Sequence, residues 1–311
     1  MPPVHAPRRL TIASRSSALS VARSEQVRAQ LLGSYPGMAV GLFTLPAQDE
    51  RGADVSPAKA GEQRFVRELE DVIASGRADL VVHALDEVPF ELRSSFALAC
   101  IAAREDPRDA FVSHYCLRPH DLPDGAVVGT ANPRREAQLR QRYPRLRYTR
   151  LCGELGARLR HLDQGRCDAI VVAAAGLKRM GFGTRIASLL EPDLSLPAPG
   201  QGALAIECRA DRPDLIEVLA VLADRATTLA TMAERAFARA LGAADCTRIA
   251  AYAEWKEGSL WLRGFLASRD GGEAMRGEAN ADAHEYAAAA QLGRDLADDF
   301  LGRGAARLLS Q

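Results

Sequence analysis

Short apolar runs alternate with segments of helical periodicity along most of this chain. The clearest run is Leu80 to Ala84, because charged and turn residues bound it on both sides. It follows Phe65 to Ile73, where apolar residues recur at helical spacing. A short, continuous apolar run is typical of a strand that is buried on both faces. The alternation therefore predicts βαβ units, mostly parallel sheets and an α/β fold.

The alternation restarts after Arg104, which predicts a second α/β lobe. A Pro- and Gly-rich bend, Leu196 to Arg209, leads into an apolar strand that we expect to return to the first sheet. Beyond Arg212, a helical stretch, several strands and a long final helix form a small α+β module. We expect two doubly wound lobes and three domains: 1–104 with 200–222, then 105–199, and finally 223–311, which carries Cys246.

Two adjacent acids, Asp86 and Glu87, directly follow the strand that begins at Leu80. Ligands of doubly wound folds bind at the carboxyl ends of core strands, and neighbouring acids take different protonation roles when their environments differ. The pair is therefore the candidate catalytic group. The alternative is structural, because acidic residues also cap turns.

Arginines recur where helices are expected to begin. Arg15 stands beside serines that can cap the first helix, and Arg134 opens a later one. Arg158 and Arg179 lie near the expected starts of the following two helices. Helix starts after parallel strands share one sheet edge, so we expect these bases to line one cleft and bind a small, multiply carboxylated ligand. The alternative is a set of solvated surface arginines. The candidate ligand-binding residues are Arg15, Ser17, Thr130, Arg134, Arg135, Arg158, Arg179 and Gln201.

Charge and cysteine content limit the classes of function that the chain can have. The 40 Lys and Arg residues balance 40 Asp and Glu residues, so the chain has no overall attraction to nucleic acid or anionic membranes. No window is apolar for long enough to span a bilayer, and we expect a monomeric, cytoplasmic protein whose partner is a small molecule. The six cysteines lack Cys-x-x-Cys spacing, which argues against a disulfide scaffold or a bound metal.

Three long segments carry a recognisable pattern. They are Arg104-Glu-Asp-Pro-Arg-Asp-Ala-Phe-Val-Ser113, Asp168-Ala-Ile-x-x-Ala-Ala-Ala-Gly-Leu-Lys-Arg179 and Leu196-Pro-Ala-Pro-Gly-Gln-Gly-Ala-Leu-Ala-Ile-Glu207. With them, nearly the whole chain resembles the hydroxymethylbilane synthase family, also called porphobilinogen deaminase. The resemblance implies two lobes like those of periplasmic binding proteins, and a third domain whose cysteine holds a dipyrromethane primer through a thioether. It also implies that arginines grip the acetate and propionate groups of the primer, and that an aspartate assists the loss of ammonia from porphobilinogen.

The chain departs from the family pattern at the acid pair and at the tether. Where the family has Lys-Asp after His-x-x, this chain has Asp86 and Glu87. An ungapped match places Asp245 at the family's cofactor-bearing cysteine, with Cys246 one residue later. Lys59 remains in the lysine-bearing segment. Cys246 and Lys59 are therefore the candidate residues for holding dipyrromethane, and the alternative for Cys246 is a small buried apolar residue.

These patterns leave three functions open. The first is a diverged enzyme that deaminates porphobilinogen, or a related dicarboxylated aminomethylpyrrole, without a tethered primer, so that its product is not the ordinary tetrapyrrole. The second is an orthodox hydroxymethylbilane synthase with the primer on Cys246. The third is a non-catalytic protein that binds an acidic ligand. We prefer the first, because the acid at position 87 and the arginines remain while the tether and the neighbouring lysine have changed.

Overall fold

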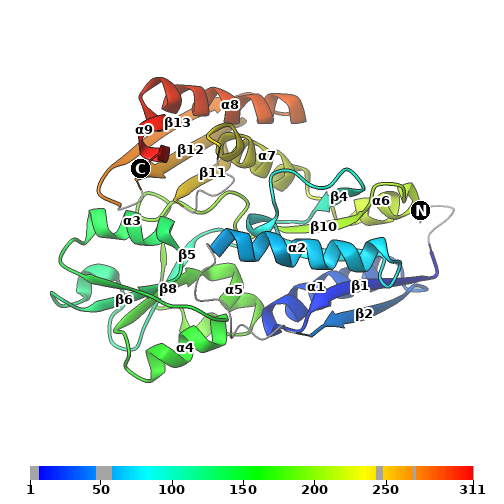
Figure 1. The fold of residues 1–311 in the computed structure, drawn as a ribbon, viewed down its shortest axis with the longest axis horizontal. Coiled ribbons are helices and arrows are strands. Elements are labelled where there is room, and N and C mark those ends of the chain that lie inside the picture. Colours follow the sequence, from blue (N-terminus) through cyan, green and yellow to red (C-terminus); the bar gives the residue numbers. More distant parts are fainter. Residues whose placement is uncertain (1–6, 47–57, 243–247, 269–270, 311) are drawn as a thin grey trace. The chain divides into compact units, whose positions relative to one another are not determined.

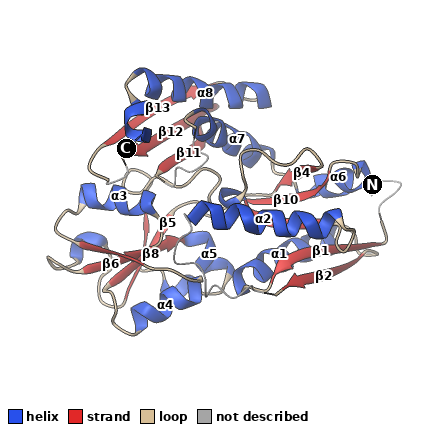
Figure 2. Ribbon diagram, viewed as in Figure 1, coloured by secondary structure: helices blue, strands red, loops and turns tan. Residues whose placement is uncertain are grey.

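The computed structural model describes residues 7–46, 58–242, 248–268 and 271–310, with only the backbone described for 58–64 (Figure 1, Figure 2). The chain forms two compact units, each made of two stretches of sequence. The first unit is Met1–Arg104 with Ala203–Thr228, and the second is Glu105–Gly202 with Leu229–Gln311. The chain therefore leaves the first unit after Arg104 and returns to it at Ala203.

A five-stranded sheet forms the centre of the first unit, in the order β2-β1-β3-β10-β4. Its strands are β1 (Arg9–Arg15), β2 (Ala39–Leu45), β3 (Leu80–Ala84), β4 (Phe96–Ile101) and β10 (Leu204–Arg209). β1 runs parallel to β2 and β3, whereas β10 runs antiparallel to both β3 and β4. The sheet is therefore mostly parallel, as predicted, except for the one strand that arrives from a later part of the chain.

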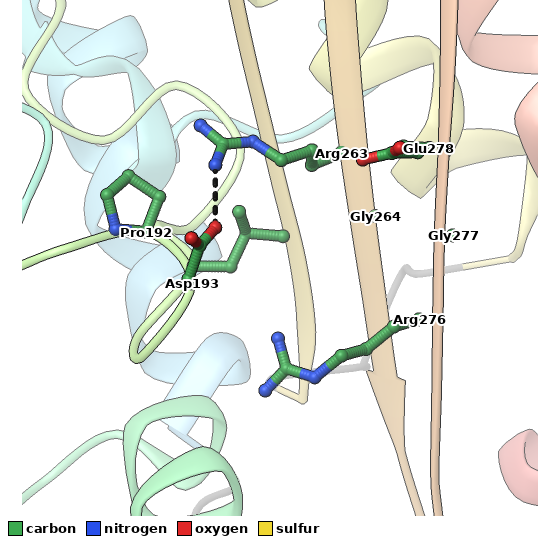
Figure 3. A pocket seen from close by; sticks show the side chains of 8 residues that line it. Pro192, Asp193, Arg263, Gly264, Arg276, Gly277 and Glu278 are labelled. Carbon is green, nitrogen blue, oxygen red and sulfur yellow. Dashed lines mark hydrogen bonds and ion pairs between the residues drawn. The ribbon is translucent and has the colours of Figure 1, made fainter.

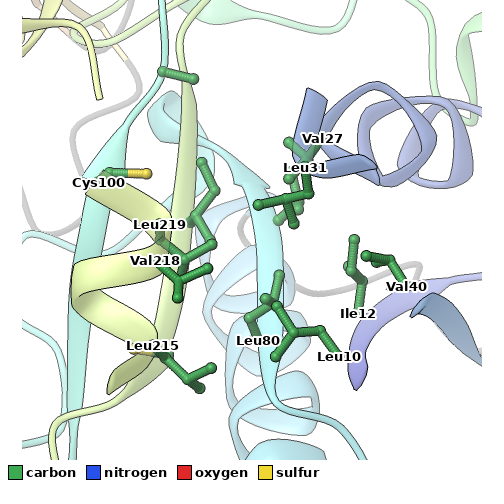
Figure 4. Packing of buried hydrophobic residues seen from close by; sticks show 14 of the residues in the cluster. Leu10, Ile12, Val27, Leu31, Val40, Leu80, Cys100, Leu215, Val218 and Leu219 are labelled. Atoms are coloured by element: carbon green, nitrogen blue, oxygen red, sulfur yellow. The ribbon is translucent and has the colours of Figure 1, made fainter. Parts of the chain in front are cut away.

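Helices cover both faces of this sheet. They are α1 (Ala18–Ser34), α2 (Ala58–Ala74) and α6 (Pro213–Leu219), with the 3-10 turns η1 (Leu85–Glu87) and η4 (Ala220–Leu222). On one face, Leu80 packs in a cluster with Leu31 of α1 and Leu215 of α6 (Figure 4). On the other face, Val81 packs in a cluster with Ile73 of α2. Because neighbouring strand residues point to opposite faces and both faces are covered, β3 is apolar except for His83.

The second unit contains a sheet with the same pattern of connections, in the order β7-β6-β8-β5-β9. Its strands are β5 (Asp109–Ser113), β6 (Val127–Thr130), β7 (Arg147–Arg150), β8 (Ala169–Ala173) and β9 (Ser188–Leu190). Its helices are α3 (Pro133–Arg142), α4 (Leu155–Asp163) and α5 (Ala174–Arg179), with η2 (Pro119–Asp121) and η3 (Gly183–Arg185). Leu139 of α3 packs on one face with Val171, and Leu159 of α4 packs on the other with Val172. This lobe is therefore also doubly wound.

The rest of the second unit is a small α+β domain. Its antiparallel sheet contains β11 (Ile249–Lys256), β12 (Ser259–Ala267) and β13 (Ala274–Ala281), and its helices are α7 (Arg225–Ala240), α8 (Tyr286–Gly302) and α9 (Ala305–Ser310). Phe237 of α7 and Phe300 of α8 meet edge to face, with ring centroids 5.0 Å apart. Phe265 of β12 shares an apolar cluster with Ala137 of α3 and with Leu196, which joins this domain to the doubly wound lobe of the same unit.

Gly293 sets the distance between α7 and α8. A Cβ atom at this position would lie 2.2 Å from the carbonyl oxygen of Ala233 and 2.8 Å from the Cβ of Ala236. Alanine in a helix is normally more stable than glycine by about 0.5–1 kcal/mol, but here it must push the two helices apart. We therefore expect Gly293→Ala to lower the free energy of unfolding by about 1–3 kcal/mol.

Gly302, the last residue of α8, provides the matched control. Nothing lies within 4 Å of the position that its Cβ would take. We expect Gly302→Ala to leave the free energy of unfolding unchanged or slightly higher, because no neighbour has to move. Urea unfolding measures both variants, and equal values for the two would contradict the close packing at Gly293.

The strand orders confirm the two doubly wound lobes and the small C-terminal α+β domain. Among the helices of the described residues, none is both long enough and apolar enough to cross a membrane. The expected cytoplasmic location, the monomeric state and the domain boundaries after residues 104, 199 and 222 stay predictions.

Candidate active site

The acid pair lies where β3 ends. Every residue of β3 is buried, and the chain turns directly into η1 after Ala84. Leu85 fixes this turn, because its side chain is buried and its amide donates a hydrogen bond to the carbonyl oxygen of Ala203 over 3.0 Å. Asp86 and Glu87 follow and are exposed. Both acids therefore lie at the carboxyl end of a core strand, as the sequence predicts.

Arg23 of α1 contacts both carboxylate oxygens of Glu87. Its Nη1 and Nη2 atoms donate to Oε2 and Oε1 over 2.9 and 3.0 Å. The Arg23 side chain is 11% exposed and the Glu87 side chain 43%, so one partner is buried and the other is open to a ligand. Partial removal of Glu87 from water would raise its pKa, but the Arg23 guanidinium outweighs this effect, and the pKa of Glu87 lies below its usual value. Glu87 is thus held as an oriented carboxylate.

Two further groups act on the pKa of Glu87. His83 and Arg15 also lower the pKa of Glu87, with smaller effects than Arg23. Arg15 ends β1, where its guanidinium carbon lies 3.6 Å from the centre of the Phe65 ring. The structure therefore brings Arg15, a predicted ligand-binding residue, near Glu87, a predicted catalytic residue.

The start of α1 explains how Arg23 reaches this position. Ser17 is the N-cap, and its Oγ atom accepts a hydrogen bond from the amide of Ser20 over 3.3 Å. Arg23, Val27 and Leu31 follow at a spacing of four residues and are buried on one face of the helix. Sequence reasoning missed Arg23, although an arginine within an apolar helical stripe signals a buried anionic partner.

His83 of β3 is bound to a buried pair of carboxyl groups. Its Nε2 atom lies 2.9 Å from Glu207 Oε2, and Glu207 and Glu70 are both buried. Burial, followed by the charge of Glu207, raises the pKa of Glu70, which favours a proton on Glu70. Arg93 Nε lies 2.6 Å from Glu70 Oε2 at the other end of this network. The network joins α2, β3 and β10, and so fixes the strand that carries the acid pair.

In the second unit, three predicted ligand-binding residues meet at the buried carboxylate of Asp109. Arg134 Nη2 donates to Asp109 Oδ2 over 2.9 Å, and Arg135 Nε donates to Oδ1 over 2.7 Å. Gln201 Nε2 and Ser195 Oγ donate to the same carboxylate over 2.9 and 2.7 Å. Burial alone would raise the pKa of Asp109, but the two arginines and these hydrogen bonds lower it to about 2.

This cluster changes the interpretation of Arg134 and Arg135. Both side chains are buried, and both are paired with Asp109. Sequence reasoning expected a carboxylate partner for them and missed that the protein itself supplies one. The sequence does carry a signal for this buried partner, because Asp109 is an acid at the start of an otherwise apolar strand. Ligand binding by Arg134, Arg135 and Gln201 stays a prediction.

Thr130, the fourth predicted ligand-binding residue of this region, lies just before the start of α3. Asn132 is the N-cap, and its Oδ1 atom accepts a hydrogen bond from the Arg134 amide over 2.9 Å. Thr130 is buried at the end of β6, where its Oγ1 atom accepts from the Asn132 amide over 3.3 Å. Thr130 therefore supports the turn into α3, and its contact with a ligand stays a prediction.

Arg158 and Arg179 occupy opposite ends of their helices. Arg158 lies near the start of α4, as expected, and its Nε atom donates to the carbonyl oxygen of Gly153 over 2.8 Å. Arg179 is the last residue of α5, so the prediction that it lies near a helix start is wrong. The reason is that β8 passes into α5 at Ala174 without a connecting loop. Arg179 Nη2 donates to the carbonyl oxygen of Gly202 over 2.8 Å.

The candidate cofactor residues are described only in part. Cys246 and Asp245 lie outside the described residues, and Lys59 lies in α2 with only its backbone described. Three described cysteines are buried: Cys100, Cys167 and Cys208. Burial raises the pKa of the Cys100 thiol to about 12 and that of the other two to about 11. A thiol with a raised pKa is a poor nucleophile, so these three do not fit a thioether-linked dipyrromethane.

A hollow of about 330 Å³ lies in the second unit, between the loop at Pro192 and the C-terminal sheet (Figure 3). Arg263 donates to Asp193 over 3.0 Å in its wall, and the Arg276 side chain extends toward the same loop. None of the predicted site residues lines this hollow. Leu196 does, and its carbonyl oxygen accepts a hydrogen bond from Arg134. Within the described ranges, no three His, Cys, Asp or Glu side chains are grouped so that they could hold a metal ion.

The two doubly wound sheets and the acid pair after β3 define a class, the two-lobed α/β proteins with an acidic site at a strand end. The model of the porphobilinogen deaminase, dipyromethane cofactor binding domain matches residues 10–217. The model of the porphobilinogen deaminase C-terminal domain matches residues 228–302. The chain belongs to the porphobilinogen deaminase family, which confirms the predicted family and its class of enzyme, a transferase.

Curated relatives named porphobilinogen deaminase match nearly the whole chain. The protein of Laribacter hongkongensis is 49% identical over 299 residues, which is 96% of each chain. The protein of Thiobacillus denitrificans is 46% identical over 301 residues, covering 96% of this chain and 97% of the relative. Among solved structures, a nutrient binding protein from Burkholderia cenocepacia bound to methionine is similar over 68% of this chain and 89% of that one, with 15% identity and a TM-score of 0.41.

Proposed function

We propose that this protein binds porphobilinogen, or a related dicarboxylated aminomethylpyrrole, and removes its amino group as ammonia. The observation that carries the proposal is the carboxylate of Glu87, which Arg23 holds ionised at the end of β3. This is the position at which the family resemblance implies the catalytic acid. The names of the curated relatives support the substrate class.

The role proposed for Glu87 is electrostatic. The protonated aminomethyl group of the pyrrole is positively charged, and its carbon–nitrogen bond breaks when ammonia leaves with both bonding electrons. The remaining azafulvene cation keeps the positive charge, which a fixed carboxylate stabilises. An acceptor, either water or a carbon of a second pyrrole, then bonds to the methylene carbon and loses a proton. Asp86 is the second candidate for assisting this reaction.

The carboxylate groups of such a substrate need cationic partners. Arg15, Arg158 and Arg179 are partly exposed and can form the two parallel hydrogen bonds by which arginine binds carboxylates. Arg134 and Arg135 are buried against Asp109, so less of their charge is available to a ligand. We propose that Arg15, which belongs to the same unit as Glu87, holds a carboxylate of the substrate. Arg158 and Arg179 are the candidate carboxylate-binding residues of the second unit, where Arg134 and Arg135 mainly fix the Asp109 cluster.

We also propose that no primer is tethered to this chain, so that the product differs from the ordinary linear tetrapyrrole. A thioether requires a sulfur nucleophile, and the residue at the family's cysteine position is Asp245. The alternative is an orthodox hydroxymethylbilane synthase with dipyrromethane on Cys246. It is supported by the match of residues 10–217 to the dipyromethane cofactor binding domain.

Two measurements on the purified protein test this proposal. Intact-protein mass spectrometry is expected to give the mass of the sequence alone. Incubation with porphobilinogen is expected to release ammonia and to yield a product other than the linear tetrapyrrole.

Each measurement has a result that contradicts the proposal. An added mass of two pyrrole units, lost in Cys246→Ala, would establish the orthodox enzyme. Porphobilinogen that stays unchanged after long incubation at high protein concentration would rule out deamination. Calorimetry that then shows tight binding would indicate a binding protein instead.

A further inference from the structure

We infer that Arg23 is the positioning residue that keeps the Glu87 carboxylate ionised and fixes its direction, a role that rests on the proposed function. The two N–H groups of its guanidinium contact both oxygens of Glu87, over 2.9 and 3.0 Å. A paired contact of this kind fixes the plane of the carboxylate, which a single hydrogen bond does not. The outer part of Glu87 nevertheless stays accessible, with 43% of its side chain exposed.

Arg23 is built into the fold on the buried face of α1. Its side chain is 11% exposed, and it shares that face with Val27 and Leu31. An arginine that is removed from water requires an anion, and Glu87 is the carboxylate within hydrogen-bonding distance of its Nη1 and Nη2 atoms. Because Val27 and Leu31 pack α1 on the sheet, Arg23 presents its guanidinium to Glu87 from an anchored helix.

The positive charge beside Glu87 also comes from a different part of the chain than in the family pattern. The family resemblance places a lysine directly before the acid, where this chain has Asp86. Arg23 now supplies a cation from another element. Burial alone would lower the pKa of Arg23, but Glu87 and, to a smaller extent, Asp86 raise it. The surroundings of Glu87 therefore stay positive although its neighbour in sequence is acidic.

The groups that lower the pKa of Glu87 come from three elements: Arg23 from α1, Arg15 from β1 and His83 from β3. Arg15 also faces Glu68, with Nη1 and Oε2 3.8 Å apart, and His83 is bound to Glu207 over 2.9 Å. Arg15 and His83 therefore each face another carboxyl group as well. Arg23 is the cation whose removal changes Glu87 most.

Titration of Glu87 in Arg23→Gln tests this role. Carbon-13 NMR of glutamate-labelled protein, assigned with Glu87→Gln, follows the carboxyl group without substrate. The pKa of Glu87 lies below its usual value while Arg23 is present, and desolvation, which raises this pKa, remains when Arg23 is removed. We therefore expect the pKa of Glu87 to rise by about one to three units in Arg23→Gln. The acid limb of the pH profile of ammonia release should move to higher pH by the same amount.

Arg23→Lys and Arg28→Gln complete the test. Lysine keeps the charge but cannot form the paired contact, so the pKa of Glu87 should rise less than in Arg23→Gln. Arg28 lies on the same helix, pairs with Glu25 over 3.1 Å, and its replacement should leave Glu87 unchanged. If Arg23→Gln does not fold, the titration of Arg23→Lys decides. An unchanged titration of Glu87 in the folded Arg23 variants overturns the inference.

The same data separate this inference from the proposed function. If Glu87 titrates as expected but the native protein releases no ammonia, the proposed function fails and the effect of Arg23 on Glu87 stands. If ammonia is released with the same pH profile in native protein and Arg23→Gln, the role of Arg23 fails and the function stands.

Discussion

Replacing Asp109 by asparagine is expected to lower the free energy of unfolding by about 3–5 kcal/mol. The change removes a buried charge that is paired with Arg134 over 2.9 Å and with Arg135 over 2.7 Å. Asparagine fills nearly the same space, so the loss reports on charge and not on a cavity. Both guanidinium groups would then lie buried opposite a neutral amide. Denaturation by urea or guanidinium at neutral pH measures this loss.

Asp163 provides the control for Asp109. Its carboxylate is 43% exposed and contacts Arg185 and His114 at the surface of the same unit. Exposed ion pairs contribute about 0–1 kcal/mol, so Asp163→Asn should have little effect on unfolding. If Asp109→Asn costs no more than Asp163→Asn, the buried cluster does not stabilise the second unit in the way argued from its geometry.

The Asp109 cluster also determines how stability responds to acid. The pKa of Asp109 is about 2 in the folded protein, against an ordinary value of 3.8, which applies to the unfolded chain. Because the folded value is depressed, the stabilisation is complete above about pH 4 and is lost as the pH falls towards 2. The gap between the two values corresponds to about 2 kcal/mol. The unfolding free energies of native protein and Asp109→Asn should approach each other by this amount between pH 5 and pH 2.

Glu87→Gln is expected to slow the release of ammonia from porphobilinogen by about 100- to 1000-fold. Glutamine has the same length and can still accept a hydrogen bond from Arg23, but it carries no negative charge to stabilise the azafulvene cation. We expect a smaller loss for Asp86→Asn, because Glu87 is the acid that Arg23 orients. Initial rates over a range of porphobilinogen concentrations separate the effect on kcat from the effect on KM.

Glu25→Gln is the matched control for Glu87→Gln. Glu25 is 46% exposed and pairs with Arg28 over 3.1 Å, much as Glu87 pairs with Arg23. Its replacement removes the same charge from the same unit and should leave the rate unchanged. If Glu87→Gln kept the native rate, an acid other than Glu87 would have to stabilise the cation.

The lobes could be predicted from the sequence because burial on both faces leaves a local signal. Leu80 to Ala84 is apolar at nearly every position, and the helices beside it repeat at their own period. Strand direction leaves no such signal, so the antiparallel course of β10 was not predictable from its residues. The position of Arg179 was mistaken for a related reason, because no turn residue marks the passage from β8 into α5.

The site could be predicted only where a chemically reactive side chain directly follows the end of a core strand. Glu87 directly follows a core strand, and this alone places it at the sheet edge where ligands of such folds bind. Arg23 lies 64 residues earlier in the chain, and nothing in the sequence pairs the two. Asp109 and Arg134 are likewise 25 residues apart, so the arginine was expected to meet a carboxylate of a ligand. Which side chain pairs with which depends on the folded arrangement of the whole chain. The type of each residue and the end of a strand, by contrast, can be recognised from the neighbouring sequence.

The position of β10 has a consequence for a chain that emerges from the ribosome. Among the described strands, β3 and β4 are joined only through β10, which is translated after the whole of residues 105–202. The sheet from β5 to β9 is encoded without interruption and needs no later strand. A nascent chain that stops before Leu204 can therefore complete the second sheet while the first still lacks the strand between β3 and β4. His83 has no Glu207 to bind until β10 is made. Of the two five-stranded sheets, the one that begins the sequence is therefore completed last.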